Sequence, residues 1–146
     1  MAEQENLRIA REAFEAWNAH DPARLNALLA DEFLSESDAW PEPIRGREAA
    51  GQAMQMWVKA FPDLRLDIEH MMASGEYVIT QWHGTGTHKG ELMGIAPTGR
   101  RGEGTRGCTV GQYRNGKLVH EWVYMDMATV LRQIGVLPAA ARTTAA

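Results

Sequence analysis

Cysteine is almost absent from this chain of 146 residues, where Cys108 is the single example. One cysteine excludes an internal disulfide, and no cysteine or histidine spacing typical of a zinc site is present. The chain also lacks any apolar run near the roughly 20 residues that cross a bilayer. We therefore expect no disulfide framework, no metal site and no membrane partner.

Positive charge is also scarce. Lys and Arg number 15 against 19 Asp and Glu, a net charge of −4, so we expect no nucleic-acid partner. The N-terminal segment mixes charged and apolar residues, unlike a secretory signal. Hydrophobic residues make up 45% of the chain, enough for a core at this length. We predict a cytoplasmic protein with one domain over 1–138 and a flexible tail over 139–146.

Helical spacing of apolar residues marks the first half of the chain. The stripe of Leu7, Ala10, Phe14 and Trp17 predicts an amphipathic helix that ends near His20. A short second helix should start at Asp21-Pro22, an N-cap followed by proline at the first helical position. Its buried residues are expected to be Leu25, Leu28 and Leu29.

A third helix is predicted over 47–61 and a closing helix over 127–134. Between them the apolar period changes to two, which predicts strands near 64–70, 77–83, 107–113 and 117–125, besides a short strand over 33–38. The segment 84–101 is rich in glycine and is expected to be irregular. Helices followed by antiparallel strands describe an α+β domain with helices on one face of a sheet and a hollow at its open end.

The turn Arg114-Asn115-Gly116 leaves the register of the last hairpin open. Asn-Gly favours either a two-residue primed turn or a three-residue loop with Gly116 left-handed. The two alternatives differ by one residue and change which side chains of 117–125 face the interior.

Four segments together resemble the SnoaL-like polyketide cyclases, a branch of the nuclear transport factor and ketosteroid isomerase superfamily. They are FPDLRLDIEHM (61–71), GTHKGELMGIAPTGRR (86–101), the NGK turn (115–117) and DMATVLRQIG (126–135). The resemblance implies a curved antiparallel sheet wrapped around N-terminal helices, forming a cone with an apolar pocket. It also implies no cofactor and a side-chain acid/base that drives an aldol closure.

Two positions depart from the pattern of that family. The catalytic aspartate of the cyclases lies six residues after the lysine of the hairpin turn, where this chain has Val123. A histidine that assists them lies eight residues before that lysine, where this chain has Thr109. The histidine of GTHKG is matched by His88, and an aromatic pocket residue of the first helix by Trp17.

Asp126 is the first candidate for the missing acid/base. An ionised carboxylate at a pocket rim can remove a proton next to a carbonyl. The alternative is an N-cap that accepts backbone N–H bonds at the start of the closing helix. The sequence favours the cap, because a strand ends and a helix begins at this residue.

Glu121 and His88 are the other catalytic candidates. In the three-residue-loop register Glu121 shares a face with Thr109 and Val123, and burial among apolar walls would raise its pKa. A solvated strand position is the alternative. His88 is either a proton carrier or a side chain that braces the loop.

The substrate-binding candidates are large apolar residues expected to line the interior or its mouth. Trp40 stands in a polar, proline-rich loop and suggests either a lid over an apolar ligand or a dimer contact. The full set is Trp17, Trp40, Met54, Trp57, Tyr113 and Val123.

These features predict a cofactor-independent enzyme that cyclises or isomerises a small apolar or aromatic carbonyl compound. The alternatives are a non-catalytic binder of the same fold or an epoxide hydrolase-type activity. A homodimer is expected, with Tyr113, Trp122 and Tyr124 offering apolar area on the sheet.

Overall fold

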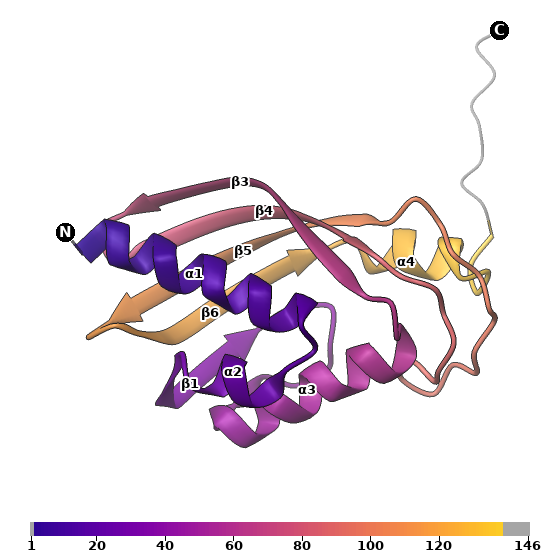
Figure 1. Ribbon diagram of the computed structural model, residues 1–146. Helices are drawn as coiled ribbons and strands as arrows, with labels where there is room; N and C mark the ends of the chain where they lie inside the picture. The colour runs from indigo at the N-terminus through magenta and orange to yellow at the C-terminus, as the bar shows by residue number, and fades with distance from the viewer. Residues whose placement is uncertain (1, 139–146) are drawn as a thin grey trace, which may run out of the picture.

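The computed structural model describes residues 2–138, and the expected tail at 139–146 lies outside them. Two helices begin the chain, two strands precede the third helix, and four strands and a closing helix follow (Figure 1). The elements are α1 (Ala2–Asn18), α2 (Pro22–Asn26), β1 (Leu29–Glu36), β2 (Ile44–Arg45), α3 (Gly46–Ala60), β3 (Arg65–Ser74), β4 (Tyr77–Thr85), β5 (Thr105–Arg114), β6 (Lys117–Met125) and α4 (Met127–Gln133).

The strands form one six-stranded sheet in the order β2-β1-β6-β5-β4-β3. Strands β3 to β6 make an antiparallel meander, as predicted. One pair departs from the expected antiparallel pattern, because β1 runs parallel to β6. No short turn joins these two strands, since α3 and four further strands lie between them in the chain, and so a hairpin does not fix their relative direction.

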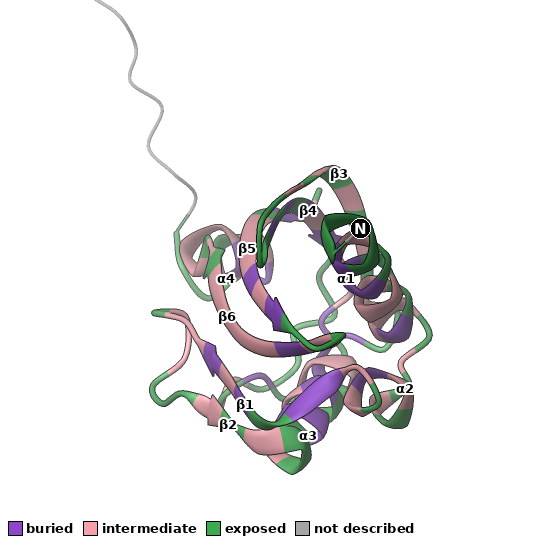
Figure 2. Cartoon of the chain, turned by 90° about the vertical axis from the view of Figure 1, so that its left-hand side faces the viewer, coloured by how far each residue is buried: buried purple, intermediate pink, exposed green. Residues whose placement is uncertain are grey.

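The sheet curves around the helices. Helix α1 packs against β3 and β4, and α3 packs against β1 and α2. Figure 2, which looks along the curve, shows β3 to β6 bending over α1 while α2 and α3 cover the side next to β1. The sheet therefore stays open, and the helices close the concave side. No helix among residues 2–138 is long and apolar enough to span a bilayer.

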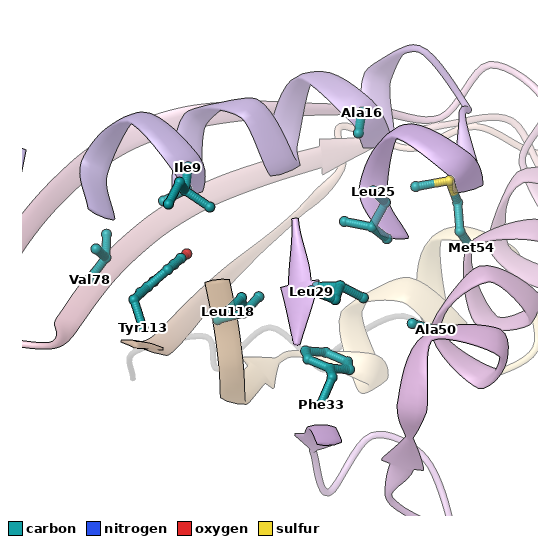
Figure 3. Close-up of a cluster of buried hydrophobic side chains, with 11 residues drawn as sticks. Ile9, Ala16, Leu25, Leu29, Phe33, Ala50, Met54, Val78, Tyr113 and Leu118 are labelled. Carbon is teal, nitrogen blue, oxygen red and sulfur yellow. The ribbon is translucent and has the colours of Figure 1, made fainter. Parts of the chain in front are cut away.

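One cluster of buried side chains fills the space between α1, α2, α3 and the inner face of the sheet (Figure 3). Ile9 of α1 meets Val78 and Tyr113 from the sheet, and Met54 of α3 lies near Leu25 of α2. A second cluster packs the end of α3 against α4 through Phe61, Leu92 and Ile134, among others. The first cluster thus packs α1, α2 and α3 against the sheet, and the second packs the end of α3 against α4.

The predicted start of α2 is confirmed, because the Asp21 side chain accepts the Arg24 N–H at 3.0 Å. Its predicted extent is wrong. The helix ends at Asn26, and Leu29 already belongs to β1, which begins before the strand expected at 33–38. Leu29 is buried and Leu28 half-buried because the chain turns into a strand, not because the helix continues. The spacing of apolar residues alone does not separate these cases.

The turn between β5 and β6 combines the two registers left open by the sequence. Arg114 pairs with Lys117, so the loop has two residues, and Asn115 and Gly116 both have positive φ, at 52° and 73°. The register then shifts at a bulge, so that Gln112 pairs with His120 across the extra residue Val119. Beyond the bulge Thr109 lies opposite Val123. This pairing differs by two residues from that of a three-residue loop, so the same side chains of β6, Glu121 and Val123 among them, face the interior as that loop would direct.

Candidate functional site

A cavity of about 180 Å³ lies between the concave face of the sheet and the helices. Each of the helices α1 to α4 and each of the six strands contributes to its wall, together with loops that include Trp40 and the segment 102–104. Most of the wall is apolar. The aromatic side chains that line it are Phe14, Trp17, Phe33, Trp40, Trp57, Phe61 and Trp82. Flat aromatic surfaces on several sides suit a flat apolar ligand.

Glu121 is the ionisable side chain of this wall, and no other lines the cavity among residues 2–138. As a residue Glu121 is half-buried, because part of its side chain forms cavity surface. The surrounding protein nevertheless separates its carboxyl group from bulk water, and this burial raises the pKa of Glu121. A hydrogen bond from Ser35 and the nearby His120 oppose the rise without reversing it.

Ser35 and Glu121 meet because β1 and β6 run side by side in parallel. The two residues are register partners, and Ser35 Oγ donates to Glu121 Oε1 at 2.9 Å. Ser35 itself is buried, so the carboxyl is held from one side by a fixed donor. The bulge at Val119 completes the arrangement, since without it His120 rather than Glu121 would share the inner face with Thr109.

Other polar groups of the wall are mostly bonded to the protein. Thr105 Oγ1 donates to the Asp126 carbonyl at 3.3 Å, and the Gln133 side chain bonds both backbone groups of Gly104. Thr109 Oγ1 accepts the Trp82 Nε1–H at 3.0 Å. No Lys or Arg side chain reaches the described wall, and within residues 2–138 no group of three metal-binding side chains comes together. The site is thus one carboxyl group in an apolar, aromatic chamber.

The sequence profile of the SnoaL-like polyketide cyclases matches residues 7–134. This chain belongs to the SnoaL-like polyketide cyclase family. The match spans every element that lines the cavity of this SnoaL-like chain. Among curated proteins, no relative matches it.

Solved structures with the same fold include two from streptomycetes. AclR from Streptomyces galilaeus, described as a candidate hydroxylase, is 27% identical with a TM-score of 0.84, over 96% of this chain and 87% of AclR. IdmH from Streptomyces antibioticus, described as a candidate polyketide cyclase, is 28% identical with a TM-score of 0.77, over 90% of this chain and 99% of IdmH.

A third structure, a SnoaL-like protein from Jannaschia sp. CCS1, has a TM-score of 0.84 over 93% of this chain and 95% of its own. At 19% identity it supports the fold alone.

The structure brings some of the predicted site residues together and separates others. Those that line the cavity are Trp17, Trp40, Trp57, Glu121 and Val123. Met54 and Tyr113 do not line it, and both side chains are buried in the first core cluster (Figure 3). The inward-facing side of a helix or strand supplies residues both to the packed core and to the cavity wall. A pattern that predicts an inward-facing side chain therefore does not distinguish a core residue from a cavity residue.

Asp126 lies outside the cavity wall and is exposed. Its carboxylate accepts the Thr129 N–H at 2.9 Å and the Thr129 hydroxyl, so it caps α4. These hydrogen bonds lower the pKa of Asp126 below its usual range. The cap that the sequence offered as the alternative is therefore present, and Asp126 is not among the residues that line the cavity.

His88 is fully buried but also lies outside the cavity wall. Its Nδ1 accepts the Thr98 backbone N–H at 3.2 Å, which leaves the ring proton on Nε2. That nitrogen has no partner among the described residues, and the ring of Phe61, a cavity residue, packs against it with centroids 5.5 Å apart. The imidazole is thus bonded to the glycine-rich loop at Thr98, rather than to the backbone carbonyls of 90–94 that the alternative interpretation expected.

Ser35 and Trp82 are the polar contributors that sequence reasoning missed. Ser35 stands in β1, and only the parallel pairing with β6 brings it to Glu121. Trp82 follows the alternation of β4, which predicts an inward side chain but not the cavity position of its indole N–H.

Proposed function

We propose that this protein is a cofactor-independent acid/base enzyme that cyclises or isomerises a flat, uncharged carbonyl compound, with Glu121 as the group that carries the proton. The observation behind this proposal is the single ionisable side chain in an apolar cavity. Membership of a family of polyketide cyclases supports it. An uncharged substrate is favoured because residues 2–138 contribute no cationic side chain to the wall that could pair with a carboxylate or phosphate.

Glu121 is suited to this reaction because burial raises its pKa. A carboxylate that holds its proton more tightly is a stronger base, closer in basicity to what proton transfer near neutral pH requires. The hydrogen bond from Ser35 fixes the orientation of the carboxyl group. Such positioning makes proton removal from a bound substrate an intramolecular event.

In the proposed reaction the Glu121 carboxylate takes a proton from the carbon next to a substrate carbonyl, and the C–H electrons form the enolate. For ring closure, the enolate carbon attacks a second carbonyl carbon of the same molecule, a C–C bond forms, and the new alkoxide takes the proton back from Glu121. For isomerisation, the same proton returns to another carbon. Both routes leave the enzyme unchanged and need no oxidant or metal.

Exchange of ketone α-hydrogens for deuterium tests the proton-transfer step without the natural substrate. Three aromatic ketones, 1-tetralone, 1-indanone and 4-chromanone, serve as probes in D₂O, with NMR as the measurement. We expect the wild-type protein to accelerate exchange of at least one of them. Glu121→Gln should reduce the accelerated rate by at least 100-fold, because the amide cannot accept the proton.

The matched control is Asp126→Asn, which removes a carboxylate outside the cavity and keeps the cap, because Asn caps about as well as Asp. This variant should exchange at the wild-type rate with an unchanged Tm. Equal exchange in wild type and Glu121→Gln would contradict the proposal. Tight binding of the ketones without any exchange would instead favour a non-catalytic binder of the same fold.

The proposal includes a homodimer formed through the outer face of the sheet. Four apolar residues there, one on each strand from β3 to β6, are register partners in sequence: Met72 with Ile79, Ile79 with Val110, and Val110 with Trp122. A continuous apolar row on an open sheet face favours association with a second sheet. Tyr124, at 58% exposed, adds to the same face.

A further inference from the structure

Thr109 presents an unused hydroxyl proton to the cavity. Its Oγ1 accepts the Trp82 Nε1–H at 3.0 Å, and no described residue accepts a hydrogen bond from the hydroxyl in return. Two other hydroxyls of the wall are already used, because Ser35 donates to Glu121 and Thr105 donates to the Asp126 carbonyl. Thr85 also lines the wall, but its hydroxyl accepts no hydrogen bond from the described residues that would polarise it as Trp82 polarises Thr109. A hydroxyl that accepts one hydrogen bond donates a stronger one. The Thr109 hydroxyl is therefore a polarised hydrogen-bond donor that is available to a ligand in a mostly apolar wall.

The position of Trp82 is built by two glycines. Gly107 is the register partner of Trp82, and a Cβ placed there would lie 2.1 Å from the indole Cζ2. A Cβ at Gly84 would lie 3.3 Å from Cζ3 of the same ring. The indole thus lies flat over backbone that has no side chain, and this placement brings Nε1 within hydrogen-bond distance of Thr109.

Thr109 also stands at a useful distance from Glu121. On the two antiparallel strands Thr109 pairs with Val123, while Glu121 pairs with Gly111 two residues further along. Diagonal neighbours on one face of such a pair are about 7–8 Å apart. A ketone bound between them can direct its carbonyl oxygen toward Thr109 and its α-carbon toward Glu121.

We propose that Thr109 donates its hydroxyl hydrogen bond to the carbonyl oxygen of the substrate, and that Trp82 is a positioning residue which orients and polarises this hydroxyl. The inference rests on the proposed function of Glu121. As the carboxylate removes the α-proton, negative charge moves onto the carbonyl oxygen, and the bond from Thr109 strengthens there. A donor placed at that oxygen stabilises the enolate more than the ketone, as an oxyanion hole does.

The ¹³C chemical shift of a bound carbonyl reports this hydrogen bond separately from proton transfer. The same three ketones, labelled at the carbonyl carbon, are bound to wild type, Thr109→Val and Thr109→Ser. We expect the wild-type protein to move the carbonyl resonance downfield, Thr109→Val to lose most of that displacement and Thr109→Ser to retain it. Affinity should fall about 3- to 10-fold in Thr109→Val, and the exchange rate by about 100-fold.

Trp82→Phe keeps an aromatic ring but removes the N–H, so the downfield displacement should be reduced and not abolished. The matched controls are Thr105→Val, whose hydroxyl is already donated, and Thr85→Val, at another threonine of the wall. Neither should change the carbonyl shift. A shift that is unaffected by Thr109→Val, or that is lost in a control, would overturn the assignment.

Glu121→Gln separates the two proposals. If Thr109 is the donor, this variant keeps the carbonyl shift while it loses exchange. A wild-type protein that shifts the carbonyl but does not exchange contradicts the role of Glu121 and leaves Thr109 as a binding residue. Exchange that persists at the wild-type rate in Thr109→Val contradicts the role of Thr109 alone. Failure of all three ketones to bind contradicts both.

Discussion

At the scale of single residues, two carboxylates in the same stretch of chain have opposite environments. Glu121 is surrounded by apolar side chains, and burial raises its pKa. Asp126, five residues later, is exposed, and hydrogen bonds from Thr129 lower its pKa. A buried acid with a raised pKa destabilises the fold when it ionises, whereas a capping carboxylate stabilises the fold when it ionises.

Glu121→Gln should therefore change how stability depends on pH. Below pH of about 4, Glu121 is protonated in both states and the substitution has little effect. As pH rises through the raised pKa of the folded state, the wild-type protein loses stability that the variant keeps. At pH 8 we expect the Tm of the variant to exceed that of wild type, by about 2–4 °C for each kcal/mol of destabilisation that ionised Glu121 causes in the wild-type protein. At low pH the difference in Tm should vanish.

Thermal melts of both proteins between pH 4 and pH 8 provide the measurement. Asp126→Ala is the opposing control, because loss of a cap lowers stability mainly where the carboxylate is ionised. A Tm difference between wild type and Glu121→Gln that stays constant with pH would show that Glu121 does not have a raised pKa.

At the scale of elements, the site depends on how β4, β5 and β6 are paired. Gly107 is a position without room for a side chain, because the indole of Trp82 covers it. Gly107→Ala should force Trp82 away from Thr109 and destabilise the protein by about 1–3 kcal/mol. The measurements are Tm and the emission of Trp82, with Trp82→Phe used to assign that emission. Gly51→Ala is the matched control, since its Cβ would make an ordinary 3.4 Å contact in the middle of α3.

Equal melting of Gly107→Ala and wild type would contradict the close packing of Trp82 on β5. In Gly51→Ala the expected direction is the opposite, because alanine is a better helix former than glycine by about 1 kcal/mol. Comparison of Gly107→Ala with Gly51→Ala therefore separates a general effect of the added methyl group from its steric clash with the indole of Trp82.

The elements themselves were largely predictable, and their pairing was not. Helical stripes and the strand alternation of 77–83 and 117–125 depend on local periodicity, which the sequence contains in full. The bulge at Val119 and the parallel contact of β1 with β6 depend on non-local packing, which no local pattern records. Those two features decide that Glu121 faces the cavity beside Ser35. The helix cap at Asp126 was readable, because a cap is a local motif.

At the scale of the whole molecule, the two faces of the sheet have different chemistry. The concave face is covered by helices and encloses the cavity, whereas the outer face exposes apolar side chains of β3, β4 and β6. Met72, Tyr77, Ile79 and Tyr124 are all among them. An open sheet face of this kind is more apolar than a monomer usually presents, which is the physical ground for the proposed homodimer.

Ile79→Glu should disrupt that dimer. The residue lies in the middle of the apolar row, between Met72 and Val110 in the register, and a charge there would be buried against the second copy without a partner. We expect wild type to sediment as a dimer and the variant as a monomer at micromolar concentration. Met93→Glu is the matched control, because Met93 and Ile79 are both 40% exposed but Met93 belongs to the loop after β4. A wild-type monomer would contradict the proposed dimer. A dimer that survives Ile79→Glu but not Met93→Glu would show that the two copies associate through another surface. Neither result affects the proposals for Glu121 and Thr109, because both residues face the opposite side of the sheet.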